Sequence, residues 1–367
     1  MKRQLLGVAA FMLALSAHAQ DNPLWMRYCA ISPDGTSIAF TYKGDIYTVP
    51  VNGGKAAQIT TNAAHDTHPV WSPDGKQIAF ASDRMGSMDI FVVDREGGIP
   101  KRLTTHSGNE TPVAFKDADH ILFLANVMPS AEDAQFPSGQ FQQVYEVSTT
   151  GDRPVMFSSM PMEDISINKT GNALLYHDKK GYEDPWRKHH TSSITRDIWL
   201  CSLDGKRSYR KLTSFNGEDR TPVWASDGKS FYYLSEEKGS FNVFKRALDG
   251  TSSTQLTHHT KHPVRFLTAA DNGTLCYGYD GEIYTMKEGT EPRKVQISIL
   301  TDKNDKDLIR QIRRNGATEI ALSPDAKEVA FILRGDVYVT SVEYKTTKQI
   351  TNTPEQEGDI NFAPDGR

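Results

Sequence analysis

The chain has 367 residues, with 42 lysines and arginines against 46 aspartates and glutamates, so its formal net charge is −4. A nearly neutral balance with no basic stripe argues against a nucleic-acid partner. The cysteines Cys29, Cys201 and Cys276 are an odd number set far apart, which predicts buried free thiols and argues against a disulfide framework or a CxxC site.

The N-terminus has the pattern of a secretory signal. Lys2 and Arg3 precede an apolar run from Leu5 to Leu15, and Ala17-His18-Ala19 offers a small-residue cleavage site. We expect residues 1–19 to be a signal peptide cleaved after about Ala19, and the protein to be exported to the periplasm. No later stretch reaches the roughly 20 apolar residues that a membrane helix needs, so no membrane span is expected after cleavage.

A repeat dominates the rest of the chain. Its fullest copy, Val70 to Thr104, has alternating runs separated by the turn formers Pro73-Asp74-Gly75 and Gly97-Gly98, and it predicts four short strands. Six copies precede the charged stretch that follows Val295. Their first turns or first strands lie at Pro33-Asp34-Gly35, Pro73-Asp74-Gly75, Pro112-Val113, Lys169-Thr170-Gly171, Ser226-Asp227-Gly228 and Asp271-Asn272-Gly273.

Four-stranded repeats of this length are typical of β-propeller blades, because one such sheet cannot cover both of its faces alone. We expect an all-β chain, with a six-bladed β-propeller of four-stranded antiparallel blades over residues 25–297 and a connector over 298–316. Residues 317–367 would then be the first blade and the truncated start of a second propeller. Because the segment before Trp25 is too short to donate a strand, we expect the first ring to close by packing alone. The last copy stops at Arg367 inside a turn, so we expect the natural chain to continue.

Two connections between a second and a third strand are unusually long, Ala125 to Gln143 in blade three and His177 to Arg196 in blade four. In an up-and-down blade these connections share one end of the ring, so we expect them to be neighbours on one face. The second contains aromatic and cationic residues able to bind a carboxylate or a peptide end. The candidate substrate-binding residues are Tyr182, Trp186, Arg187, Lys188, His189 and His190. A solvated loop is the alternative.

The sequence offers few signs of chemistry. His189 and His190 would point apart on an extended strand and have no partner at a suitable spacing, so no metal site is predicted. The charged segment Ser82-Asp83-Arg84 to Asp89 is interpreted as structural, with its carboxylates and guanidinium stabilising a tight loop. No GxSxG, HExxH, P-loop or GxGxxG motif occurs, so we expect no catalytic residue and no cofactor within residues 1–367. Recurring aspartates at one turn position are predicted to be turn formers: Asp34, Asp74, Asp227, Asp325 and Asp365.

The stretch WSPDGKQIAFASDRMGSMDIFVVD resembles the PD40 or TolB-like repeat, which TolB, prolyl oligopeptidase relatives and tricorn proteases share. The arrangement as a whole is similar to the N-terminal part of the tricorn protease family. It has a blade-four insertion ending in Thr195-Arg196-Asp197-Ile198-Trp199, six blades, a connector and a restart at Ala317-Thr318-Glu319.

The resemblance implies the non-catalytic propeller portion of a tricorn-like serine peptidase, which filters or channels peptides or unfolded polypeptide to a catalytic region beyond residue 367. It also implies a homo-oligomer. The family's substrate-anchoring basic residues in blade three have no counterpart in Ala125 to Gln143, and Arg187 and Lys188 are possible substitutes. Two alternatives remain, a free-standing periplasmic TolB-like interaction propeller and the propeller of a prolyl-oligopeptidase-like enzyme.

Overall fold

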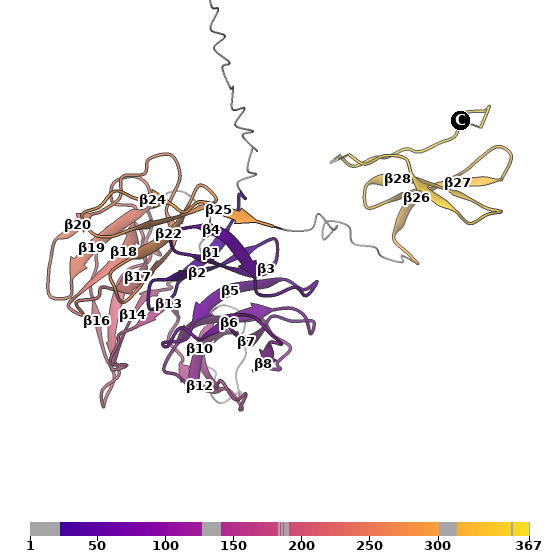
Figure 1. Ribbon diagram of the computed structural model, residues 1–367. Coiled ribbons are helices and arrows are strands. Elements are labelled where there is room, and N and C mark those ends of the chain that lie inside the picture. The colour runs from indigo at the N-terminus through magenta and orange to yellow at the C-terminus, as the bar shows by residue number, and fades with distance from the viewer. Residues whose placement is uncertain are drawn as a thin grey trace, which may run out of the picture. The chain divides into compact units, whose positions relative to one another are not determined.

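The computed structural model describes residues 23–126, 141–182, 184, 186, 191–300, 314–353 and 355–366. These residues form strands, turns and loops, and the chain divides into two compact units, Met1–Asp302 and Lys303–Arg367 (Figure 1). The predicted all-β class with four-stranded antiparallel sheets is confirmed. Within the described part of the chain, no helix is long and apolar enough to cross a membrane.

The described strands of the first unit form six sheets that follow one another in chain order. The first three sheets contain β1 (Arg27–Ile31), β2 (Ser37–Tyr42), β3 (Asp45–Pro50) and β4 (Gly54–Gln58); β5 (Asp66–Trp71), β6 (Gln77–Ser82), β7 (Asp89–Asp94) and β8 (Lys101–Arg102); and β9 (Glu110–Phe115), β10 (His120–Ala125), β11 (Gln143–Ser148) and β12 (Val155–Ser158). The next three contain β13 (Met162–Ile167), β14 (Ala173–Asp178), β15 (Ile198–Ser202) and β16 (Ser208–Lys211); β17 (Asp219–Trp224), β18 (Ser230–Ser235), β19 (Asn242–Ala247) and β20 (Ser253–Gln255); and β21 (Arg265–Ala269), β22 (Leu275–Tyr279), β23 (Glu282–Met286) and β24 (Arg293–Lys294).

The second unit has one four-stranded antiparallel sheet. Its strands are β26 (Ala317–Leu322), β27 (Glu328–Leu333), β28 (Asp336–Ser341) and β29 (Thr347–Gln349). It repeats the local chemistry of the first unit: Ser323 Oγ and the Lys327 amide donate to Asp325 Oδ1, at 2.8 and 3.1 Å.

The turns follow from the sequence as predicted. Asp74 Oδ1 accepts hydrogen bonds from Ser72 Oγ at 2.7 Å and from the Lys76 amide at 3.1 Å, and the first of these bonds is the main reason that the pKa of Asp74 is lowered. Asp34, Asp227 and Asp325 accept the same kinds of bond, so their role as turn formers is confirmed. These carboxylates accept hydrogen bonds from residues of the same turn.

The acidic segment of the second sheet also has the structural role predicted for it. The Arg84 guanidinium donates to both carboxylate oxygens of Asp66 at 3.0 and 2.9 Å, and Asp83 accepts from the His65 amide at 2.7 Å. Asp89 forms an ion pair with Arg102 at 2.8 Å. These contacts join the start of the second sheet to its loop.

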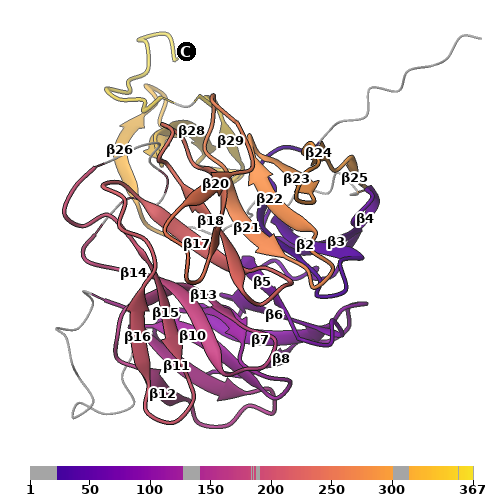
Figure 2. The same cartoon turned by 90° about the vertical axis from the view of Figure 1, so that its left-hand side faces the viewer.

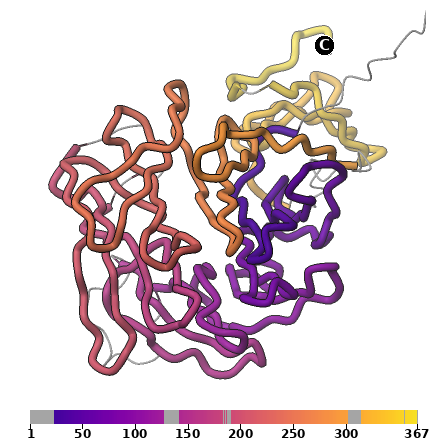
Figure 3. The backbone as a smooth tube through the Cα atoms, turned by 60° about the vertical axis from the view of Figure 1, so that its left-hand side comes forward, coloured from indigo at the N-terminus to yellow at the C-terminus, as the bar shows by residue number. Residues whose placement is uncertain are grey.

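The core of the first unit lies between the sheets. Its buried residues form six clusters, each shared by two consecutive sheets, and the last of them joins the sixth sheet to the first. Ile78, Phe80 and Phe91 pack between the first two sheets and Ile90 between the second and third. The first strands contact one another in the order β1, β5, β9, β13, β17, β21 and back to β1, so the sheets form a closed ring around these strands (Figure 3).

Ring closure differs from the expectation of packing alone. After the sixth sheet the chain continues as β25 (Ile297–Ile299), which pairs in parallel with β4 of the first sheet, and the Gly54 amide donates to the Gln296 carbonyl at 2.8 Å (Figure 2). The sixth sheet also packs on the first, through residues that include Cys276 and Ile283. The expectation of packing alone is wrong because β25, with three residues, is too short to show an alternating pattern in the sequence.

Candidate functional site

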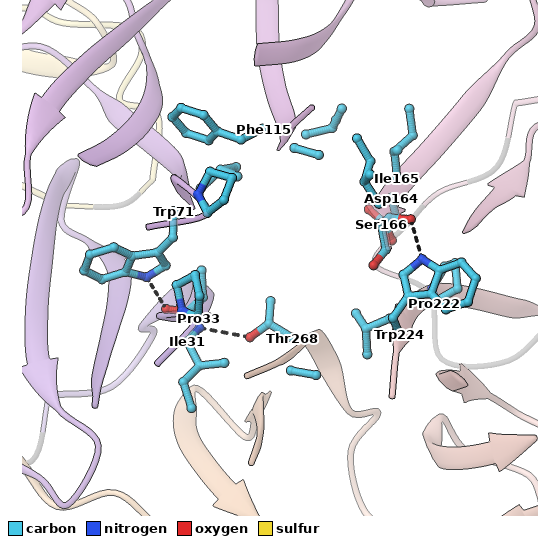
Figure 4. Close-up of a pocket in the computed structure, with 18 of the residues that line it drawn as sticks. Ile31, Pro33, Trp71, Phe115, Asp164, Ile165, Ser166, Pro222, Trp224 and Thr268 are labelled. Carbon is cyan, nitrogen blue, oxygen red and sulfur yellow. Dashed lines mark hydrogen bonds between the residues drawn. The ribbon is translucent and has the colours of Figure 1, made fainter. Parts of the chain in front are cut away.

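The first unit contains a cavity of about 1060 Å³ that all six first strands line. Each of these strands is the edge strand of its sheet. Three hydrogen bonds tie neighbouring sheets together in the cavity wall (Figure 4). Trp71 Nε1 donates to the Ala30 carbonyl and Trp224 Nε1 to the Ser166 carbonyl, both at 2.9 Å, and the Ile31 amide donates to Thr268 Oγ1 at 3.1 Å. We call this space the axial cavity.

Five of the first strands carry the same irregularity. Their pairing with the second strand shifts register at a bulge, and the bulge opens with a non-glycine residue at positive φ. These residues are Tyr28 (φ 52°), His68 (φ 55°), Asp164 (φ 49°), Thr221 (φ 52°) and Phe266 (φ 57°). All five line the axial cavity, as does Thr111, which precedes Pro112 as His68 precedes Pro69. We call these six residues the girdle.

The girdle backbone is strained. A left-handed conformation costs a non-glycine residue about 1–3 kcal/mol, and the cost is greatest for a β-branched residue such as Thr221. His68 and Thr221 also precede prolines, where a helical conformation is disfavoured further. Glycine would relieve this strain, yet no girdle residue is glycine. Strain that converges on one cavity from five strands marks the girdle as the candidate functional site.

The girdle has an aromatic half and a polar half. The Tyr28 ring lies 3.7 Å from the His68 ring and 4.9 Å from the Phe266 ring, measured between centroids. On the other half, Thr221 Oγ1 donates to Asp164 Oδ2 at 2.6 Å. A molecule in the cavity therefore meets ring faces from one direction and hydroxyl or carboxylate groups from the other.

The aromatic half is uncharged at neutral pH. Burial lowers the pKa of His68 to about 4, which leaves the imidazole neutral. Burial likewise raises the pKa of Tyr28 above its usual value, so its hydroxyl stays protonated. The formal charge of the girdle thus resides on Asp164.

A network of charged residues lies beside the polar half. His177 contacts Glu163 at 3.1 Å and Asp164 at 3.5 Å, and Lys179 contacts Glu163 at 2.6 Å. Burial alone would raise the pKa of Glu163, but the hydrogen bond and charge of His177, together with Lys179, outweigh it and hold this pKa well below the usual range. Glu163 therefore stays ionised and fixes the residues around Asp164.

Two buried arginines complete this network. Arg196 and Arg220 both donate to Glu218 Oε1, the second at 3.0 Å. Arg196 also lies 3.4 Å from Glu163, and the Arg220 guanidinium stacks 4.6 Å from the Phe241 ring. Charges buried in this way are stable only when paired, and each of these has a partner.

The structure tests the predicted binding residues only in part. Tyr182 is 89% exposed and Trp186 is 44% exposed. Arg187, Lys188, His189 and His190 lie outside the described residues. The insertion in blade three, Ala125 to Gln143, is described only at its two ends.

Trp186 reaches the edge of the girdle. Its ring lies 4.8 Å from the Arg27 guanidinium, 5.0 Å from that of Arg265 and 6.1 Å from the Phe266 ring, and its carbonyl accepts a hydrogen bond from Arg265 at 2.7 Å. Burial, with Arg220 nearby, lowers the pKa of Arg265 to about 10. Trp186 belongs to the connection between β14 and β15 of the fourth sheet, and it contacts β1 and β21, the first strands of the two sheets at the closure of the ring.

Sequence reasoning missed the girdle because its members look unremarkable when taken singly. Three of them share one signal, a polar residue directly before proline in the first strand, at His68-Pro69, Thr111-Pro112 and Thr221-Pro222. Tyr28, Asp164 and Phe266 carry no such mark. Among the described residues, no group of three or more histidine, cysteine or acidic side chains is placed to hold a metal ion.

Comparison with known proteins identifies the family. The family described as the tricorn protease N-terminal beta propeller domain matches residues 23–292. The chain belongs to this family. The matched residues include β1 to β23, and with them the six first strands that line the axial cavity, and the match ends just before β24.

Individual relatives agree with this assignment. The chain is 25% identical over 337 residues to tricorn protease homolog 1 of Streptomyces coelicolor, covering 90% of this chain and 30% of the relative. It is 25% identical over 332 residues to the tricorn protease of Thermoplasma acidophilum, covering 87% of this chain and 29% of that one. A crystal structure of the tricorn protease superposes with a TM-score of 0.68 at 18% identity, over 91% of this chain and 32% of the other. The chain therefore spans about a third of the length of these tricorn proteins.

Proposed function

We propose that this chain is the propeller portion of an exported tricorn-like serine peptidase and that its axial cavity receives peptides. The six sheets of the first unit would be a complete six-bladed propeller, and β26–β29 the first blade of a second one. Catalysis would belong to a region beyond Arg367, and the whole protein would assemble as a homo-oligomer. The tricorn proteins that match are about three times as long as this chain, which supports the assignment of catalysis to another region.

The axial cavity is the observation that carries the proposal. Its volume of about 1060 Å³ is at the upper end of the range for ligand pockets, roughly 300–1,000 Å³. Six edge strands line it, and an edge strand offers backbone donors and acceptors with which an extended peptide can pair. A peptide or an unfolded segment fits this lining better than a folded protein, which could not enter.

The direct test is peptide binding after the cavity has been filled. Thr111→Trp places a large ring in the cavity, and Thr254→Trp makes the same change on the exposed outer strand β20. We expect the first variant of the full chain to bind a fluorescein-labelled unfolded polypeptide, such as reduced casein, about tenfold more weakly. The second should bind like the wild type, with anisotropy as the measurement.

Equal binding by both tryptophan variants would remove the cavity from the proposal. It would favour the TolB-like alternative, in which the outer surface binds partner proteins. The gene sequence after Arg367 decides between a tricorn-like peptidase and a prolyl-oligopeptidase-like enzyme, because the second requires a GxSxG motif there.

Export is a separate part of the proposal and rests on the residues before Gln20. When the full chain is expressed with its own N-terminus in a Gram-negative host, we expect periplasmic protein whose intact mass corresponds to a start at Gln20. A cytoplasmic product that retains Met1 would contradict export and leave the peptide-binding proposal unaffected.

A further inference from the structure

The girdle presents one carboxylate on one half of the axial cavity and a set of neutral aromatic rings on the other half. Asp164 lies on β13 on the polar half, and on the other half the Tyr28 ring contacts the rings of His68 and Phe266 at tilted angles. Asp164 is held by Thr221 Oγ1 at 2.6 Å, so the carboxylate has a fixed position. It is nevertheless accessible, with a side chain 45% exposed.

Such a pair of surfaces recognises positive charge. A carboxylate attracts an ammonium or guanidinium group directly, and an aromatic face attracts the same group through its quadrupole. An acidic group in the same place would meet the Asp164 carboxylate, and among the six girdle residues themselves no cation is present at pH 7, because His68 is neutral. The cations next to the girdle have partners of their own: Arg196 and Arg220 are bound to Glu218, His177 contacts Glu163 as well as Asp164, and Arg27 and Arg265 lie against the Trp186 ring.

We propose that the girdle is a binding site for a cationic group of a peptide, a lysine or arginine side chain, held between Asp164 and the rings of Tyr28, His68 and Phe266. This inference rests on the proposed function for its ligand, a peptide, but it names a site and a charge preference. It also accounts for the strained backbone, because the bulge is what projects these side chains into the cavity.

The test uses pentapeptides with blocked ends, Ac-Ala-Ala-Lys-Ala-Ala-amide and its Gln and Glu counterparts, titrated into the full chain by calorimetry. We expect the Lys peptide to bind about tenfold more tightly than the Gln peptide, and the Glu peptide to bind most weakly. In Asp164→Asn the Lys peptide should bind no better than the Gln peptide, whose affinity should not change.

Asparagine is a suitable replacement because it tolerates the left-handed conformation and its side-chain oxygen can still accept from Thr221. The matched control is Asp271→Asn, which removes a carboxylate that lines the same cavity outside the girdle and pairs with Lys169 at 2.9 Å. The control should retain the preference for lysine. A preference that survives Asp164→Asn, or that is lost equally in the control, would overturn the inference.

Failure of the proposed function can be recognised separately. Butylammonium, a lysine side chain without a peptide, is titrated in parallel while the methyl resonances of Thr111 and Thr221 are followed by NMR. If no peptide binds but butylammonium shifts the Thr221 methyl in the wild type and not in Asp164→Asn, the cation site stands without the peptide function. If neither ligand binds, the cation site is refuted as well.

Discussion

Tryptophan side chains form hydrogen bonds between neighbouring sheets at the wall of the axial cavity. Trp71 is 7% exposed, and its indole N–H donates across the first two sheets to the Ala30 carbonyl. Removing one partner of a buried hydrogen bond costs about 1–3 kcal/mol. We therefore expect Trp71→Phe to lower the free energy of unfolding in urea by this amount, and half-buried Trp224→Phe to lower it by less.

The matched control for these substitutions is Trp186→Phe, because the Trp186 ring is 44% exposed. Its effect on the free energy of unfolding should stay within about 0.5 kcal/mol. If the three variants were equally destabilised, the hydrogen bonds between sheets would not be the cause.

Glu110 should make the free energy of unfolding of the first unit depend on pH. It is 2% exposed, and burial raises its pKa to about 7, against the opposing hydrogen bond from Thr104. Between the unfolded value of 4.5 and about 7 the folded state holds the proton more tightly, so stability falls as pH rises through this window. Glu110→Gln cannot ionise and can still accept from Thr104. Relative to the wild type, it should gain about 1–3 kcal/mol in unfolding free energy between about pH 5 and about pH 8.

This prediction is checked by urea unfolding of both proteins at the two pH values. The informative quantity is the change in the difference between them, because every other titrating group is common to both. A difference that does not vary with pH would show that the Glu110 carboxyl ionises normally in the folded protein.

At the scale of elements, β25 depends on a close approach of backbone at Gly53. A Cβ atom at Gly53 would lie 2.4 Å from the Gln296 carbonyl oxygen, which is closer than two such atoms can approach. We expect Gly53→Ala to displace β25 and to increase hydrogen exchange at residues 297–299. The protein should also lose stability.

Gly97 provides the matched control, because it occupies the same turn in the second sheet with φ 92°, against φ 89° at Gly53. A Cβ atom there would lie 3.6 Å from its nearest neighbour, an ordinary contact. Gly97→Ala therefore incurs the same backbone strain without the clash. Equal exchange at residues 297–299 in the two variants would show that the clash does not control β25.

The lengths of the outer strands explain why the first sheet is the one that β25 extends. The fourth strands of the other sheets in the first unit have two to four residues, whereas β4 has five. Short edge strands are poor templates for unwanted pairing, and longer ones are usually covered. β25 covers the longest of these edges.

At the scale of the whole molecule, the junction of the sixth and first sheets brings together residues from opposite ends of the ring's sequence, and β25 connects the two sheets. Cys29 and Cys276 are buried there, and Cys201 is buried between the third and fourth sheets, so the prediction of three buried free thiols is confirmed. If this junction opens first, Cys29 and Cys276 should react with a maleimide at lower urea concentrations than Cys201, with peptide mass spectrometry as the readout. Earlier labelling of Cys201 would show that another junction is weaker.

Much of the architecture could be predicted because each sheet is encoded by its own local pattern of alternating residues and turn formers. Alternating residues such as Ile78 and Phe80, bounded by Pro73-Asp74-Gly75, determine strands and turns locally. Recurrence of that pattern then favours a ring. β25 could not be predicted in this way, because three residues are too few to show a period and their partner lies some 240 residues earlier.

The girdle could not be predicted for a different reason. Its residues share a backbone conformation and not a residue type, and a left-handed φ at Phe266 or Asp164 leaves no trace in the composition of the strand. The long insertion predicts binding residues at Tyr182 and Trp186, because long loops often carry function. The structure places Trp186 against the girdle at Phe266 and leaves Tyr182 in solvent.

The position of β25 also fixes when the first unit can finish folding during synthesis. β4 is complete once Gln58 has been made, but the strand that covers it arrives only with Ile297–Ile299, after all six sheets have been translated. Until then the nascent chain presents an open five-residue edge, the kind of surface that chaperones and neighbouring nascent chains can bind. Under the proposed export this delay would be useful, because a chain that cannot close its ring early stays unfolded enough to be threaded across a membrane.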